Sequence, residues 1–87
     1  MPSVKLFANL RKIAGAKEMS IPGENLGQVL SKLIEQHPAL GAALLEGGQV
    51  RPYVIITING QHAPAGDLTP AVTEQDEIAI FPPITGG

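Results

Sequence analysis

Apolar and polar side chains alternate at both ends of the chain, and this alternation is typical of strands that bury one face. Residues 4–8 and residues 17–21 both show it, and residues 77–81 repeat it near the carboxyl end. Residues 10–15 indicate a short helical turn between the first two segments. We therefore expect a hairpin of two strands early in the chain, and one last strand at 77–81.

A longer segment has the periodicity of a helix. Asn25 is a good N-cap, and Gln28 stands three residues later, as in a capping box. Pro38 is expected to end the helix, and residues 39–45 to add another turn. Apolar residues recur at intervals of three and four and predict one apolar face, made of Leu26, Val29, Leu30, Leu33 and Ile34.

Residues 53–58 give the strongest strand signal because β-branched residues fill positions 54–58. Such a nearly continuous apolar run predicts a central strand with both faces covered, or with one face awaiting a partner. Asn59-Gly60 predicts a tight hairpin turn directly after it. Residues 63–72 have no clear pattern, and residues 73–76 indicate a turn.

This order of elements predicts an α+β domain of the β-grasp type. One main helix covers one face of a mixed sheet of about four to five strands. The last strand is expected to lie beside the first in the middle of the sheet, where both are buried. We expect residues 1–81 to form this domain and residues 82–87 to form an extended carboxyl-terminal tail.

Composition narrows the possible functions. The 87 residues include no cysteine, which excludes disulfides, cysteine zinc sites and a cysteine nucleophile. The net charge is −2 and the six basic residues are scattered along the sequence, which argues against nucleic acid as a direct partner. His37 and His62 are far apart in the sequence, so we expect no metal site. No apolar run is long enough for a signal peptide or a membrane span, and we expect a cytoplasmic protein.

The most informative chemistry lies at the carboxyl end. After Asp76-Glu77-Ile78-Ala79-Ile80 the chain reads Phe81-Pro82-Pro83-Ile84-Thr85-Gly86-Gly87. The prolines favour an extended backbone, and glycine without a Cβ passes through the narrowest channels. With the earlier run Val4-Lys5-Leu6-Phe7-Ala8-Asn9-Leu10-Arg11 and Ala14-Gly15, this block resembles the MoaD/ThiS family of ubiquitin-like sulfur carriers. The resemblance is greatest to the MoaD type, the small subunit of molybdopterin synthase.

The resemblance implies a reaction at Gly87. An E1-like enzyme of the MoeB/ThiF type uses ATP to adenylate the terminal carboxylate, and a persulfide or sulfide then converts the adenylate to a thiocarboxylate. The sulfur passes to a large synthase subunit of the MoaE type or to another sulfur-accepting enzyme. On this reading Gly86, Thr85, Ile84, Pro83 and Pro82 thread the tail into a partner's channel, and the chain itself binds no cofactor and is not catalytic alone.

Phe7 and Phe81 are the only phenylalanines, and both are expected on adjacent central strands. From the residues alone, filling the core is the simpler role for them. The resemblance implies instead an exposed or half-exposed patch beside the tail, which docks the partners. Direct contact with nucleic acid or with a membrane is not implied.

Several departures from the MoaD pattern keep other pathways open. Lys12 replaces a frequent Glu, residues 47–54 are longer than in the shortest members, and residues 74–76 replace a more usual Gly-Asp turn. The alternatives are a carrier for cysteine, thiamine or tRNA thiolation and a modifier joined to lysines through Gly87. A β-grasp interaction module with an inert tail is a further alternative.

Overall fold

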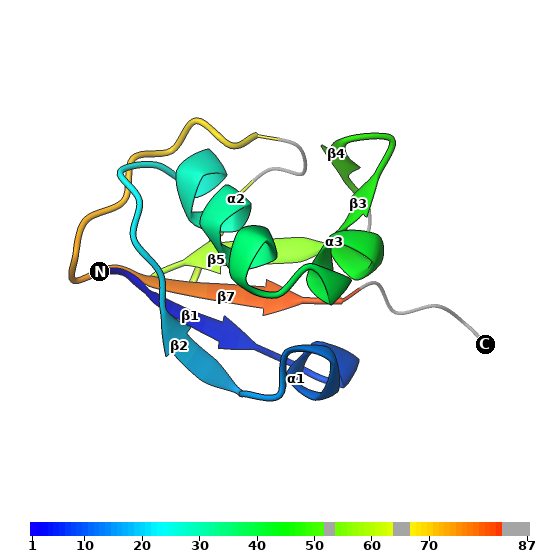
Figure 1. Ribbon diagram of the computed structural model, residues 1–87. Coiled ribbons are helices and arrows are strands. Elements are labelled where there is room, and N and C mark those ends of the chain that lie inside the picture. The colour runs from blue at the N-terminus through cyan, green and yellow to red at the C-terminus, as the bar shows by residue number, and fades with distance from the viewer. Residues whose placement is uncertain (52–53, 64–66, 83–87) are drawn as a thin grey trace.

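The computed structural model describes residues 1–51, 54–63 and 67–82. These form a main five-stranded sheet with helices packed on one of its faces, and a separate two-stranded sheet (Figure 1). The strands are β1 (Ser3–Leu6), β2 (Glu18–Ser20), β3 (Leu45–Glu46), β4 (Gln49–Val50), β5 (Ile55–Ile58), β6 (Gln61–Ala63) and β7 (Glu77–Phe81). The helices are α1 (Asn9–Ala14), α2 (Leu26–Gln36) and α3 (Ala39–Leu44).

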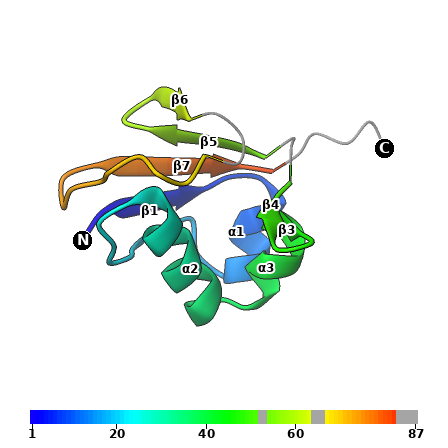
Figure 2. The same ribbon diagram turned by 90° about the horizontal axis from the view of Figure 1, so that it is seen from above.

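The main sheet has five strands in the order β2-β1-β7-β5-β6. β1 and β7 run parallel, and the other neighbouring pairs are antiparallel. The last strand therefore lies in the centre, beside the first, and the predicted β-grasp arrangement is confirmed. Viewed from above, α2 and α3 lie on one side of the sheet and leave the other side uncovered (Figure 2).

The core lies between α2 and the two central strands. Val4 and Leu6 of β1, and Ile78 and Ile80 of β7, are fully buried. The predicted face of α2 meets them with Leu26, Val29, Leu30 and Leu33. Each such side chain contributes on the order of 2 kcal/mol by leaving water, so this layer fixes how β7 sits in the sheet.

The predicted cap and turn are both present. The Asn25 side chain accepts a hydrogen bond from the Gln28 backbone N–H at 2.8 Å, and the Gln28 side chain accepts one from the Glu24 N–H. The reciprocal bond thus reaches the residue before the cap. Asn59 and Gly60 have φ of 52° and 82°, as a type I′ hairpin turn requires.

The structure differs from the sequence predictions at some element boundaries. The first strand ends at Leu6, two residues earlier than expected, because Ala8 has a φ of 53° that no strand continues through. β5 begins at Ile55, and Tyr53 lies outside the described residues. Gly47-Gly48 joins two short antiparallel strands, β3 and β4, that were not predicted.

Candidate functional site

Two aromatic rings mark the end of the central strand pair. Leu6 pairs with Ile80 across β1 and β7, so the next residues, Phe7 and Phe81, come side by side. Their rings stack with centroids 4.4 Å apart and an interplanar angle of 13°. Both are only partly buried, so the stack is open to solvent on the side that the helices leave free.

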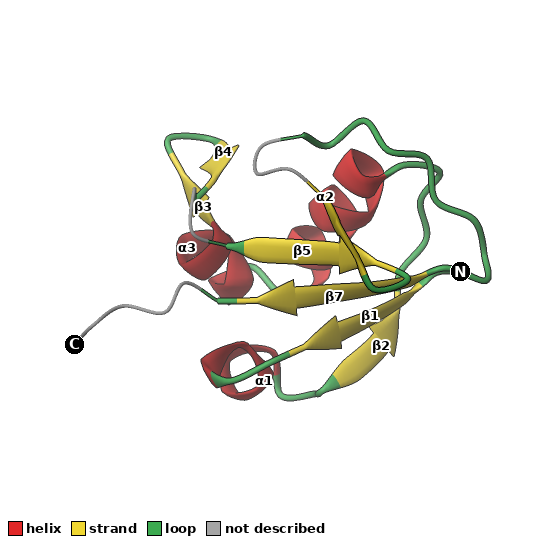
Figure 3. Cartoon of the chain, turned by 180° about the vertical axis from the view of Figure 1, so that it is seen from behind, coloured by secondary structure: helices red, strands yellow, loops and turns green. Residues whose placement is uncertain are grey.

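Ile55 extends this pair across the sheet. It is paired directly with Phe81 and is 41% exposed, and among the described residues only Met1 is a more exposed large apolar side chain. Figure 3 views the sheet from the face without α2, and β1, β7 and β5 lie side by side there. We call Phe7, Phe81 and Ile55 the apolar row. An exposed apolar row of this kind is typical of an interaction surface.

Arg11 holds one end of the apolar row in place. Its Nε donates a hydrogen bond of 2.8 Å to the Leu6 carbonyl oxygen, which lies one residue before Phe7. Its guanidinium carbon lies 5.3 Å from the centroid of the Phe7 ring, within the range of a cation–π interaction. One side chain from α1 therefore restrains both the end of β1 and the ring that follows it.

A small depression opens beside Phe7. Its volume is 240 Å³, and it is lined by Lys5, Leu6, Phe7, Arg11, Lys17 and Glu18. Lys5 also lies 3.3 Å from Glu77 across β1 and β7. Three basic residues, from β1, from α1 and from the segment before β2, thus gather at one end of the apolar row.

The other end of β7 is fixed by a polar latch. The Asn59 amide donates to Asp76 Oδ1 at 2.8 Å and accepts from the Glu77 N–H at 2.9 Å. Asp76 also accepts from the Thr73 N–H at 2.8 Å. These bonds to the charged carboxylate, the one from Asn59 first, lower the pKa of Asp76. The latch ties the β5–β6 turn to the start of the central strand.

The residues predicted to carry the chemistry are only partly covered by the described structure. Pro82 follows β7 directly and is partly buried. Pro83, Ile84, Thr85, Gly86 and Gly87 lie outside the described residues, so their threading and transfer roles stay predictions. The docking role of Phe7 and Phe81 also stays a prediction, although the structure places the two rings together and partly exposed.

The two histidines lie in separate elements. His37 caps the end of α2, where its backbone N–H donates to the Leu33 carbonyl oxygen. His62 is on β6 and pairs with Thr57 on β5. In the ranges 1–51, 54–63 and 67–82, no three His, Cys, Asp or Glu side chains are grouped closely enough to hold a metal ion. None of the described helices has the length and apolarity needed to cross a membrane.

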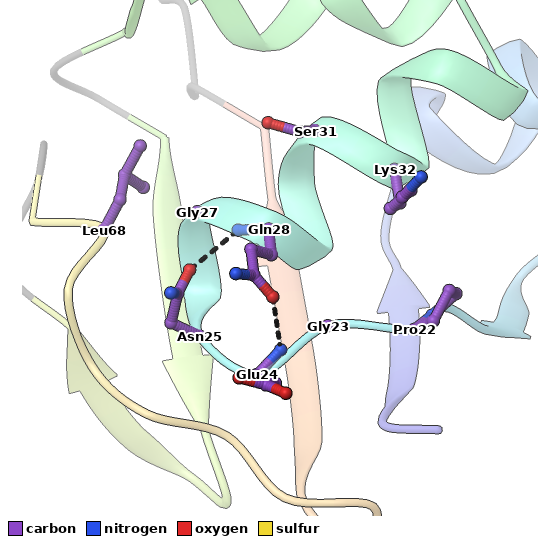
Figure 4. Close-up of a pocket in the computed structure, with 9 residues that line it drawn as sticks. All are labelled: Pro22, Gly23, Glu24, Asn25, Gly27, Gln28, Ser31, Lys32 and Leu68. Carbon is purple, nitrogen blue, oxygen red and sulfur yellow. Dashed lines mark hydrogen bonds between the residues drawn. The ribbon is translucent and has the colours of Figure 1, made fainter.

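A larger pocket lies at the start of α2, away from the predicted site (Figure 4). Its volume is 630 Å³, and Leu68 from the irregular segment closes one side. Asn25 and Gln28 line it, but their side chains are engaged in the helix cap described above. The pocket contains none of the predicted site residues.

Reasoning from sequence missed Ile55 and Arg11. Ile55 was part of an all-apolar run, so its exposed orientation becomes visible only from its pairing with Phe81. Arg11 stands four residues after Phe7, and only the sharp turn at Ala8 brings its guanidinium back over that ring. The sequence carries no periodic signal for either contact.

Comparison with known proteins identifies the family of this chain. The ThiS family model matches residues 4–87. Small archaeal modifier protein 1 of Haloferax volcanii is 33% identical over 87 residues, covering 95% of this chain and 97% of the relative. The human molybdopterin synthase sulfur carrier subunit is also 33% identical, covering 97% and 91%.

The fold comparison agrees. The solution structure of small archaeal modifier protein 1 from Methanosarcina acetivorans superposes with a TM-score of 0.86 and is 37% identical. It covers 98% of this chain and 94% of that structure. The predicted family is thus confirmed, while the similarity extends to archaeal modifiers as well as to the MoaD type. The chain belongs to the ThiS/MoaD family of ubiquitin-like sulfur carriers.

Proposed function

We propose that this protein carries sulfur as a thiocarboxylate on Gly87. The observation that supports this most strongly is where the apolar row lies. β7 ends at Phe81, inside the row, and Pro82 leads directly into the segment that bears Gly86-Gly87. A partner that docks on the row is therefore within a few residues of the reacting end.

The proposed chemistry explains why the partner, not this chain, supplies catalysis. A carboxylate is a poor acyl donor because oxide is a poor leaving group. A terminal oxygen attacks the α-phosphate of ATP, pyrophosphate leaves, and an acyl adenylate forms on an E1-like enzyme. A persulfide sulfur then attacks the acyl carbon and AMP leaves. A thiol reduces the resulting acyl disulfide and releases the thiocarboxylate.

We propose the MoaD type of acceptor for this sulfur. A large subunit of the MoaE type would take up the tail and pass the sulfur to a molybdopterin precursor. The support is the 33% identity to the human molybdopterin synthase sulfur carrier subunit over nearly the whole chain. Adding the sulfur-loaded protein to such a large subunit and the precursor tests this acceptor. Formation of molybdopterin is expected, and its absence would redirect the proposal to another acceptor.

Intact-mass spectrometry of the protein from its native cell tests the carrier chemistry. We expect a population in which one oxygen at Gly87 is replaced by sulfur. Incubation with the E1-like enzyme, ATP and a persulfide donor should increase it, and deletion of Gly87 should abolish it. Absence of this species under loading conditions would refute the carrier proposal.

A second candidate function is supported by the relatives named as small archaeal modifier proteins. As a modifier, Gly87 would form an isopeptide bond with a lysine amine, and AMP would leave. Digestion of the cell's proteins should then yield lysines that bear a remnant of this tail. Sulfur at Gly87 without such remnants would assign the protein to carrier chemistry alone.

A further inference from the structure

The basic residues are unevenly distributed around the apolar row. Four of the six fall between positions 5 and 17, where the sequence has no acidic residue: Lys5, Arg11, Lys12 and Lys17. The protein as a whole has a net charge of −2. A local excess of positive charge on an acidic protein is a directional feature, because it favours one orientation of a charged partner.

Three of these four side chains share the depression beside Phe7. We call this depression the basic notch; Lys5, Arg11 and Lys17 line it, and Glu18 is the only acidic side chain among its described lining residues. Lys5 is already paired with Glu77. Among the described residues, no carboxylate lies within salt-bridge distance of Arg11 or Lys17. Two cations therefore remain available to a ligand.

Arg11 is prepared for a carboxylate. Its Nε donates to the Leu6 carbonyl, so the guanidinium is anchored, and no described residue accepts a hydrogen bond from its two terminal nitrogens. Such nitrogens form strong, paired hydrogen bonds with a carboxylate. Because the side chain is already restrained by the hydrogen bond and by Phe7, little further conformational entropy is lost on binding.

The described strands on the other side of the apolar row, β5 and β6, contain no Lys or Arg. Next to Ile55 on β5, the same face carries Thr57 and its cross-strand partner His62. A partner with an apolar patch could otherwise sit on the row in either direction. The notch breaks that symmetry.

We propose that the basic notch receives a carboxylate side chain of the enzyme that activates Gly87. The apolar row supplies the buried area, and the notch sets the direction in which the enzyme docks. The partner surface is accordingly an apolar patch with an acidic side chain at the end that meets β1 and α1. This inference rests on the proposed function, since it requires an activating enzyme.

Charge reversal with a matched control tests the notch. Lys17→Glu reverses a charge in the notch, and Lys32→Glu makes the same change on the exposed side of α2, where Lys32 lies 3.8 Å from Glu35. Pyrophosphate release by the E1-like enzyme of the source organism, with ATP, is the readout. We expect Lys17→Glu to raise KM for this protein roughly fivefold or more with kcat unchanged, and Lys32→Glu to leave both near wild type.

Salt and a compensating substitution sharpen the result. KM of the wild type should rise with ionic strength, and the difference between the two variants should shrink as salt screens the charges. Replacing the facing carboxylate residue of the enzyme by Lys should return the KM of the Lys17→Glu variant towards the wild-type value. Equal KM values for the two variants at low salt would refute the proposed docking role of the notch and leave the carrier proposal intact.

Two other outcomes are informative. Wild-type protein that releases no pyrophosphate would refute the proposed function and, with it, this inference. If ATP alone, without enzyme, shifts the amide NMR signals of residues 5–17, the notch binds a free anion and its assignment to a protein carboxylate is overturned.

Discussion

Phe7 and Phe81 pack against each other and yet stay partly exposed, as their proposed docking role requires. Each ring covers part of the other at 4.4 Å, so the stack shields apolar surface that would otherwise meet water. Each ring also remains partly exposed. Truncating a side chain in this position lowers the free energy of unfolding less than truncating a core residue, because part of its area is already hydrated in the folded state.

Comparison of two neighbouring substitutions tests that reading. Phe81→Ala should lower the free energy of unfolding by about 1–2 kcal/mol, through loss of the stack and of part of the buried ring. Ile80→Ala, one residue earlier and fully buried, should cost about 2–5 kcal/mol. Urea denaturation measures both. Equal losses would mean that Phe81 is a core residue and not a surface anchor.

Elements in this fold are fixed largely at their ends. α2 begins at the Asn25 cap, and irregular residues bond to its first turn, where the Leu26 and Gly27 N–H groups donate to Pro70 and Leu68. β7 begins at the latch between Asn59 and Asp76. These polar contacts decide where each apolar face starts, and the core then holds it in register.

Removal of the cap gives an element-scale prediction. Asn25→Ala should lower the free energy of unfolding by about 1 kcal/mol, because the Gln28 N–H loses its acceptor. Ser31→Ala, at an exposed position in the same helix, should be nearly neutral or slightly stabilising. Thermal unfolding followed by circular dichroism compares them. The same loss for both would argue against a specific capping contribution.

The latch predicts a dependence of stability on pH. Its hydrogen bonds hold the pKa of Asp76 below the ordinary value, so the stabilisation is present above about pH 4 and is lost as pH falls through the folded pKa. Asp67 is shifted in the same direction by Thr69. We expect Asp76→Asn to be less stable than wild type at pH 7, and the difference to shrink at low pH. Urea unfolding at several pH values measures it; a difference that grows with acidity would contradict the latch.

The sequence predicted the elements better than the surfaces they form. The cap at Asn25, the turn at Asn59-Gly60 and the place of the last strand follow from local chemistry and from the need to bury Ile78 and Ile80. The apolar row and basic notch depend on pairing across distant segments. Ile55 meets Phe81 only through strand register, and Arg11 reaches Phe7 only because the backbone turns at Ala8.

At the scale of the whole molecule, the sheet is completed by the end of the chain. Among the described strands, β7 is the only sheet partner of β5 other than β6, and the only partner of β1 other than β2. Without it the sheet would divide into two unconnected pairs of strands. Such pairs are marginal in water.

Truncation at two points tests this dependence. A chain ending at Pro82 should keep its free energy of unfolding within about 0.5 kcal/mol, because the described core ends at Ile80. A chain ending at Asp76 should lose cooperative unfolding. Urea denaturation followed by circular dichroism distinguishes the two. A large loss in the first truncation would mean that residues 83–87 stabilise the domain.

The central position of β7 also has a consequence for synthesis. A ribosome makes the first hairpin and the main helix before the strand that joins the two halves of the sheet, so folding waits until Phe81 has emerged. An interrupted translation product lacks both the ring of Phe81 and a complete sheet. Such a fragment cannot present the apolar row. The proposed docking partner would therefore bind complete chains and not unfinished ones.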